Sequence, residues 1–62
     1  MESAVYRFIE DEGGATSSRK IKDVLFPKED IIEVVNILSE YKSIRQIKYD
    51  GVSLGNELWR AF

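Results

Sequence analysis

The segment from Phe26 to Ser43 carries the longest unbroken helical period of the chain, and it limits the possible folds more than any other stretch. At about 100° per residue, its apolar side chains fall within a stripe about 120° wide. The residues of this stripe are Ile31, Val34, Val35, Leu38 and Tyr41. The opposite side carries Glu29, Glu33, Asn36 and Glu40, with Ile32 and Ile37 on the two flanks. The pattern predicts a central helix that buries one face and turns an acidic face with apolar edges outward.

Size and composition predict a single small domain over residues 1–62. A chain of 62 residues buries only about 60% of its unfolded surface, which leaves little room for a catalytic cleft. Hydrophobic residues make up 44% of the chain, which indicates a globular domain although 32% of residues are charged. Cysteine and histidine are both absent, so disulfides are excluded and the two commonest zinc ligands are missing. We expect either a whole small protein or a module excised from a longer one.

Charge and hydropathy predict an intracellular, soluble protein, nuclear if its source is eukaryotic. The apolar runs are far shorter than the roughly 20 residues that span a bilayer, and the N-terminus lacks the pattern of a signal peptide. The net charge of -2 gives no general attraction to nucleic acid or to an anionic membrane. We therefore expect no membrane partner, and nucleic-acid binding requires a local cluster of basic residues.

A first helix is predicted over residues 2–12. Its apolar residues recur at i, i+3 and i+4, and a pair of glycines ends it. These residues are Val5, Phe8 and Ile9, followed by Gly13 and Gly14. Residues 15–18 are predicted to form a short polar link.

A second helix, from about Ser18 to Leu25, is predicted to meet the central helix in a tight turn. Pro27 separates the two, because the residue before a proline disfavours the helical region and proline itself suits the first turn of a new helix. We expect Glu29 and Asp30 in that first turn, where the helix dipole favours carboxylates.

The C-terminal part of the chain predicts a two-stranded hairpin. Residues 44–49 and 58–62 are rich in strand formers, and Asp50–Gly51 between them is a strong turn signal. A two-residue turn at this dipeptide would pair Tyr49 with Val52.

A longer hairpin loop through Gly55 is the alternative. It would pair Ile47 with Leu58 and leave Val52 and Leu54 on an exposed tip. We favour this longer loop, because two glycines four residues apart weaken any strand between them.

Three helices, a tight turn between the second and third, and a two-stranded hairpin follow the order of a small α+β winged helix-turn-helix domain. The segment SSRKIKDVLFPKEDIIEVVNILSEYKSIRQI resembles the small helix, turn, recognition helix and first wing strand of that family. More narrowly, DIIEVVNILSEYKSI and LWRAF are similar to winged-helix units of the RNA polymerase III initiation subunit related to transcription factor IIE. The iron–sulfur cysteines of that family are absent, so the resemblance covers one module at most. It implies a non-catalytic role in the transcription or genome-handling machinery.

The outward face of the central helix favours a protein partner over a DNA groove. A helix that reads the major groove needs Arg, Lys, Asn or Gln on that face, whereas this one carries three glutamates and Asn36 alone suits a base. Apolar flanks with a charged rim suit a protein interface. The predicted protein-binding residues are Glu29, Ile32, Glu33, Asn36, Ile37 and Glu40. If the first helix or the hairpin covers Ile32 and Ile37, a solvated acidic ridge remains instead.

Weak, sequence-independent DNA binding is the alternative function. Basic residues of the second helix and the wing could hold phosphates, and exposed aromatic rings could stack on unpaired bases. The residues predicted for this role are Ser18, Arg19, Lys20, Lys22, Lys42, Arg45, Lys48, Tyr49 and Arg60. Trp59 could join the stacking, although we expect it in the core, because so small a domain needs its large apolar side chains inside.

No catalytic constellation is visible in the sequence. Nucleophilic cysteine and histidine are absent, and so are the phosphate-binding G-x-x-x-x-G-K loop and the G-x-S-x-G nucleophile motif. We expect no enzyme activity, no cofactor, no metal site and no small-molecule substrate.

Overall fold

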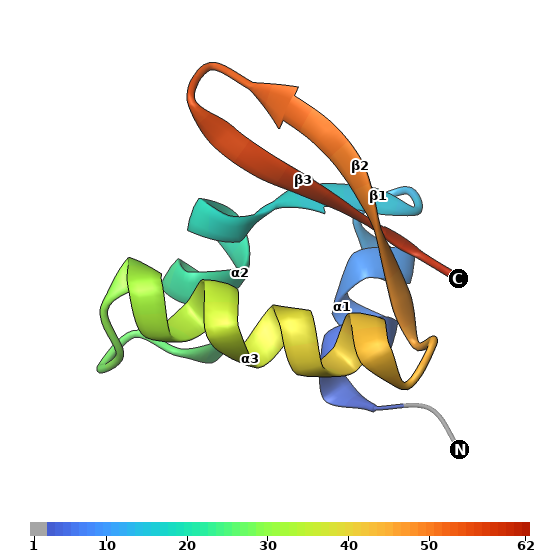
Figure 1. Ribbon diagram of the computed structural model, residues 1–62, viewed down its shortest axis with the longest axis horizontal. Helices are drawn as coiled ribbons and strands as arrows, with labels where there is room; N and C mark the ends of the chain where they lie inside the picture. Colours follow the sequence, from blue (N-terminus) through green and yellow to red (C-terminus); the bar gives the residue numbers. More distant parts are fainter. Residues whose placement is uncertain (1–2) are drawn as a thin grey trace.

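Three helices and a three-stranded antiparallel sheet form the computed structural model, which describes residues 3–62 (Figure 1). The helices are α1 (Ala4–Asp11), α2 (Ser18–Leu25) and α3 (Ile31–Ser43), and the strands are β1 (Ala15–Ser17), β2 (Ile47–Ser53) and β3 (Asn56–Ala61). Within the sheet, β3 lies between β1 and β2. The predicted α+β class, with three helices and a C-terminal hairpin, is confirmed. None of the helices in residues 3–62 has the length and apolar content that a membrane crossing requires.

Helix α1 is closed at both ends by local hydrogen bonds. The Ser3 side chain caps its N-terminus, and the predicted first residue, Glu2, lies outside the described part of the chain. The predicted end at the two glycines is confirmed. Gly13 takes a positive φ of 93°, and the Gly14 N–H donates to the Ile9 carbonyl oxygen at 3.0 Å. Glycine suits this helix-ending motif because it has no Cβ to clash in the left-handed region.

Strand β1 replaces the predicted polar link at residues 15–18. It pairs antiparallel with β3 and sets Thr16 opposite Trp59. The prediction of a link was wrong. Three small, mostly polar residues show no alternation of apolar and polar side chains in the sequence, and they form a strand only because they pair with β3. Ser17 ends β1 and caps α2, since its hydroxyl accepts a hydrogen bond from the Lys20 N–H at 3.2 Å.

Helix α3 begins at Ile31, and Asp30 directly precedes it. The backbone of Asp30 is extended, and its Oδ1 accepts a hydrogen bond from the Glu33 N–H at 2.8 Å. Asp30 is therefore the cap of the helix, and the prediction that Glu29 and Asp30 occupy the first turn is wrong. Glu29 lies in the loop between α2 and α3.

The hairpin closes in a two-residue turn at Leu54–Gly55, where the φ angles are 53° and 79°. The predicted longer loop is wrong, because Ile47 lies opposite Ala61 and not opposite Leu58. Leu54 does lie at the exposed tip, whereas Val52 belongs to β2.

Asp50–Gly51 forms a β-bulge inside β2, so the alternative turn at this dipeptide is also wrong. Glycine supplies a positive φ in a bulge as readily as in a turn, and the sequence alone does not distinguish the two. Tyr49 lies opposite Trp59, and Val52 lies opposite Glu57. Because opposed residues share a face and residues two apart on β3 share a face, the bulge places Tyr49 and Val52 on the same face.

The core lies between the helices and one face of the sheet, and five of the six elements contribute to it. Its buried apolar residues are Val5, Ile9, Ile21, Val34, Leu38, Ile47 and Trp59. The centre of the predicted α3 stripe is thus buried. Trp59 is only 3% exposed, which confirms its predicted place in the core rather than on a nucleic-acid surface.

Candidate functional site

A groove of about 370 Å³ lies between the N-terminal half of α3 and the far end of the hairpin. Three apolar side chains of α3 form one wall, and residues of the hairpin and the first turn of α2 complete it. The lining residues are Arg19, Ile31, Ile32, Val35, Asn36, Gly55, Asn56 and Glu57. We call this feature the α3–hairpin groove.

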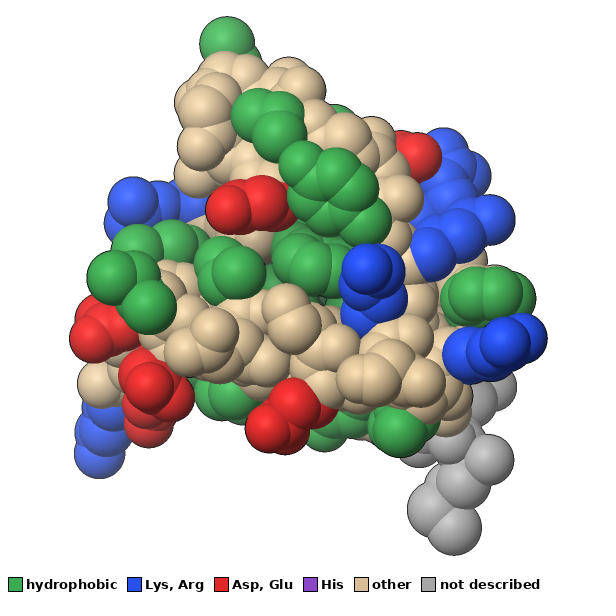
Figure 2. All heavy atoms as spheres, viewed as in Figure 1, with side chains coloured by type: hydrophobic (Ala, Val, Ile, Leu, Met, Phe, Trp, Pro, Cys, Tyr) green, Lys and Arg blue, Asp and Glu red, His purple; other side chains and the backbone are tan. Residues whose placement is uncertain are grey.

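Exposed apolar side chains occur on both elements that form the groove. Ile32 of α3 is 70% exposed, and Val52 of β2 is 62% exposed. Val52 lies on the same face of the hairpin as Glu57, which lines the groove. Figure 2 shows the hydrophobic side chains as a nearly continuous band that runs from α3 up the hairpin. Exposed apolar patches of this kind mark interaction sites.

Two opposite charges line the groove without pairing. Arg19 stands in the first turn of α2, and Glu57 stands on β3. Within residues 3–62, neither side chain takes part in an ion pair or a side-chain hydrogen bond. Both charges are therefore free to meet groups of an incoming partner.

The acidic side chains of α3 lie outside the groove. Glu40 lines a separate hollow of about 380 Å³ together with Ile37, Tyr41 and Ile44. At about 100° per residue, Glu33 and Glu40 differ by only about 20° around the helix axis. Figure 2 shows acidic side chains along the border of α3 that faces away from the hairpin.

The six predicted protein-binding residues are therefore divided around α3. Ile32 and Asn36 lie together in the α3–hairpin groove, and Ile32 is not covered by other elements. Ile37 is half-buried on the other side of the helix, where Glu40 lies. Glu29 is exposed in the preceding loop.

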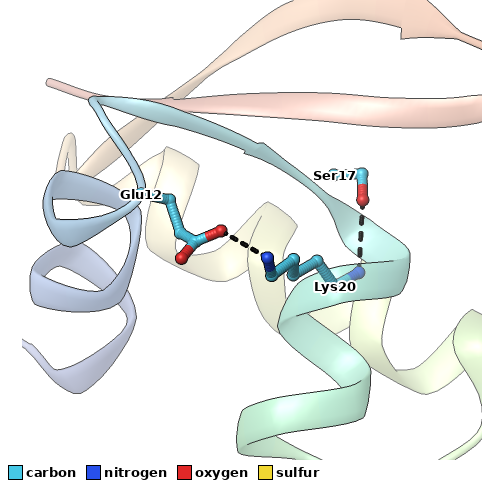
Figure 3. A network of polar contacts seen from close by, with 3 residues as sticks. All are labelled: Glu12, Ser17 and Lys20. Atoms are coloured by element: carbon cyan, nitrogen blue, oxygen red, sulfur yellow. Dashed lines mark hydrogen bonds and ion pairs between the residues drawn. The ribbon is translucent and has the colours of Figure 1, made fainter.

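Lys20, predicted as a phosphate contact, is engaged within the fold. Its Nζ lies 2.9 Å from Oε1 of Glu12, which follows α1. Figure 3 shows the lysine side chain reaching from α2 toward the end of α1, while its own backbone N–H is held by Ser17. This ion pair partly neutralises the basic cluster of α2.

The basic residues of the hairpin lie on the face opposite to Tyr49. Lys48 and Arg60 are directly opposed on neighbouring strands, one position away from the opposed Tyr49 and Trp59. Nη2 of Arg60 lies 3.4 Å from Oδ2 of Asp50, and the Lys48 ammonium lies 5.5 Å from the centre of the Phe62 ring. The Tyr49 ring packs edge-on against the Trp59 ring, and the two ring centres are 5.6 Å apart. Tyr49 and the two basic side chains thus cannot contact one nucleic-acid segment from a single face.

The remaining residues of the predicted nucleic-acid set are also dispersed. Ser18 is fully buried, so its side chain is not on the surface, as a nucleic-acid contact would require. Lys22 is half-buried on α2, whereas Lys42 and Arg45 lie at the C-terminal end of α3. Arg19 lines the groove near the other end of that helix. Figure 2 shows the basic side chains on this face as separate groups, not as one strip.

Sequence reasoning missed the hairpin half of the groove. Val52, Asn56 and Glu57 had no assigned role, and Val35 was assigned to the core although it is only half-buried. The bulge at Asp50–Gly51 decides which side chains of β2 beyond it share a face with Glu57, and it places Val52 there. A bulge leaves no signal in the sequence that separates it from a turn.

Within residues 3–62, no group of three or more His, Cys, Asp or Glu side chains could hold a metal ion. No family model matches the chain, and comparisons with curated proteins and with solved structures find no match.

Proposed function

We propose that the chain is a winged helix-turn-helix module that binds a protein partner through the α3–hairpin groove and carries out no catalysis. The order helix, strand, helix, helix, hairpin supports this assignment, with α2 and α3 as the helix pair and the β2–β3 hairpin as the wing. The sequence resemblance to winged-helix units of the transcription machinery supports a role in assembling such machinery.

One observation carries the proposal. Ile32 lines the groove and is 70% exposed, and Val52, which is 62% exposed, lies on the same hairpin face as Glu57, which lines the groove too. Polar groups of Asn36 and Asn56 lie beside them. An apolar centre with hydrogen-bonding groups at its edge is the usual composition of a protein interface.

The charges of α3 argue against DNA as the main ligand. A duplex carries one negative charge per about 1.7 Å of its axis, and Glu33 and Glu40 would face it if α3 entered the major groove. Lys42, in the last turn, is the one basic residue of α3. The ion pair of Lys20 and the burial of Ser18 weaken the rival surface on α2.

A DNA titration separates the two functions. Fluorescence anisotropy with duplex and single-stranded DNA, at two salt concentrations, is expected to give dissociation constants weaker than about 100 μM at physiological salt. Binding in the micromolar range that falls steeply with salt, and that is lost in Arg19→Glu/Lys20→Glu, would favour the DNA function instead.

The protein partner is tested with matched variants of the groove. The wild-type chain, Ile32→Asp and Val24→Asp serve as baits for proteins of the source cell. Val24 is 55% exposed on α2 and does not line the groove, so its variant controls for the new charge. We expect a partner that binds the wild type and Val24→Asp and is lost with Ile32→Asp. Equal retention of that partner by all three baits would contradict the proposal.

A further inference from the structure

We propose that the partner in the α3–hairpin groove is a second copy of this chain, in a symmetric dimer in which Leu54 of each copy enters the groove of the other. The inference rests on the proposed function, because it uses the same groove and names its occupant. Three features carry it: the conformation of Leu54, the place of that residue beside the groove, and the two unpaired charges.

Leucine is an unfavourable residue for the turn position that Leu54 occupies, and a smaller polar residue would form the same turn. Its φ is 53°, and its side chain is 98% exposed. Residues other than glycine are uncommon at positive φ, and two-residue hairpin turns favour Asn, Asp or Gly at this point. A large apolar side chain in water adds a second unfavourable term. The turn needs the positive φ but not a leucine, and strained residues cluster at functional sites, which makes the exposed Leu54 side chain a candidate binding anchor.

The anchor and the groove lie side by side on one surface. Gly55 and Asn56, which line the groove, follow Leu54 directly in the chain. In a two-fold dimer, each copy presents the same surface, so a contact of Leu54 with Ile32 of the other copy is made twice. Ile31, Ile32 and Val35 give the incoming leucine an apolar wall. One surface therefore supplies both the projection and the hollow that such a dimer needs.

The charges in the groove are self-complementary. Arg19 and Glu57 line the same groove and lack ion-pair partners within the described chain. In the proposed dimer Arg19 of one copy meets Glu57 of the other, and the two-fold symmetry makes the same contact a second time with the copies exchanged. Opposite charges that meet across an interface fix its register and exclude other arrangements.

The first test measures self-association by sedimentation equilibrium between about 1 μM and about 1 mM, the range expected for a small interface. We expect the wild type to dimerise and Leu54→Asn to lower the association constant at least about tenfold. The same variant is expected to unfold at a higher temperature, because asparagine tolerates the left-handed region. Lower association in a more stable chain does not arise from misfolding. Val24→Asn, an exposed site outside the groove, is expected to associate like the wild type.

The second test exchanges the charges. Arg19→Glu and Glu57→Arg each oppose like charges in a homodimer, so each is expected to weaken self-association about tenfold. In an equimolar mixture of the two variants, every altered side chain meets an opposite charge on the other chain. We therefore expect heterodimers in the mixture, detected by energy transfer between differently labelled chains. Absence of heterodimers would overturn the pairing of Arg19 with Glu57.

Two results would overturn the dimer itself. One is a wild-type chain that stays monomeric at about 1 mM. The other is equal association of the wild type and Leu54→Asn, since the chains would then meet through another surface. The proposed function fails on different results, namely retention of the partner protein by Ile32→Asp or duplex binding that depends on Arg19 and Lys20.

Discussion

The indole N–H of Trp59 donates a 2.7 Å hydrogen bond to the hydroxyl of Ser18, and both side chains are buried. The same hydroxyl donates to the Glu57 carbonyl oxygen at 3.4 Å. This contact joins the central strand to the first turn of α2. Arg19 follows Ser18 in the chain, so the buried contact also holds Arg19 and Glu57 at one end of the groove.

Ser18→Ala is expected to lower the free energy of unfolding by about 1–3 kcal/mol, because it leaves the buried Trp59 N–H without an acceptor. Urea unfolding followed by tryptophan fluorescence measures the loss. Ser39→Ala is the matched control, since its hydroxyl bonds the Val35 carbonyl oxygen on an exposed helix surface, and we expect a change within about 0.5 kcal/mol. Equal effects of the two substitutions would show that the buried bond contributes nothing specific.

Arg45→Gly is expected to stabilise the domain by about 1 kcal/mol. Arg45 follows α3 with a φ of 63°, and the Gln46 N–H donates to the Tyr41 carbonyl oxygen at 3.0 Å, which is the hydrogen bond of a helix end that normally uses glycine. Thermal unfolding measures the gain. Lys42→Gly, inside the last turn, provides the opposite control with an expected loss of about 1 kcal/mol. A destabilised Arg45→Gly variant would mean that the arginine side chain makes up for its backbone strain.

Arg45 and Leu54 explain why the C-terminal third was hard to predict. Both take conformations that sequence rules reserve for glycine or asparagine, whereas Asp50–Gly51, the strongest turn signal, forms a bulge. Such rules rank residues by their local backbone preference. At these sites the pairing of β2 with β3 decides the backbone conformation instead. The helices were easier, because periodic apolar residues and capping side chains are local signals.

Two of the predicted protein-binding residues lie in the groove, and the others do not. Exposed Ile32 and the neighbouring Asn36 followed from the helical period of α3 and do lie in the groove. Glu33 and Glu40 share that helix, but their position relative to the hairpin depends on how the sheet packs, which no local pattern encodes. Val52 lies on the same face as Glu57 because two residues of β2, Asp50 and Gly51, oppose a single residue of β3.

The ion pair of Lys20 and Glu12 is expected to contribute little to stability despite its 2.9 Å separation. The two side chains are 55% and 29% exposed, and water and salt screen pairs of this kind. Lys20→Ala should therefore change the free energy of unfolding by less than about 1 kcal/mol, with little dependence on salt. Thermal unfolding at low and high salt measures this. A loss well above that range would show that the pair holds α1 against α2.

Replacing the acidic residues of α3 tests whether they keep this helix from binding DNA. Glu33→Lys/Glu40→Lys removes two negative charges from one side of α3 and adds two positive ones, and each new phosphate contact steepens the salt dependence of binding by about 0.9 in the log–log slope. We expect duplex affinity at low salt to rise at least about tenfold in this variant. Glu10→Lys/Asp11→Lys makes the same change of net charge at exposed positions of α1 and is expected to gain much less. Equal gains in both variants would mean that net charge alone governs binding. A gain confined to α3 would show that the helix has the geometry to approach a duplex and that its glutamates weaken that approach.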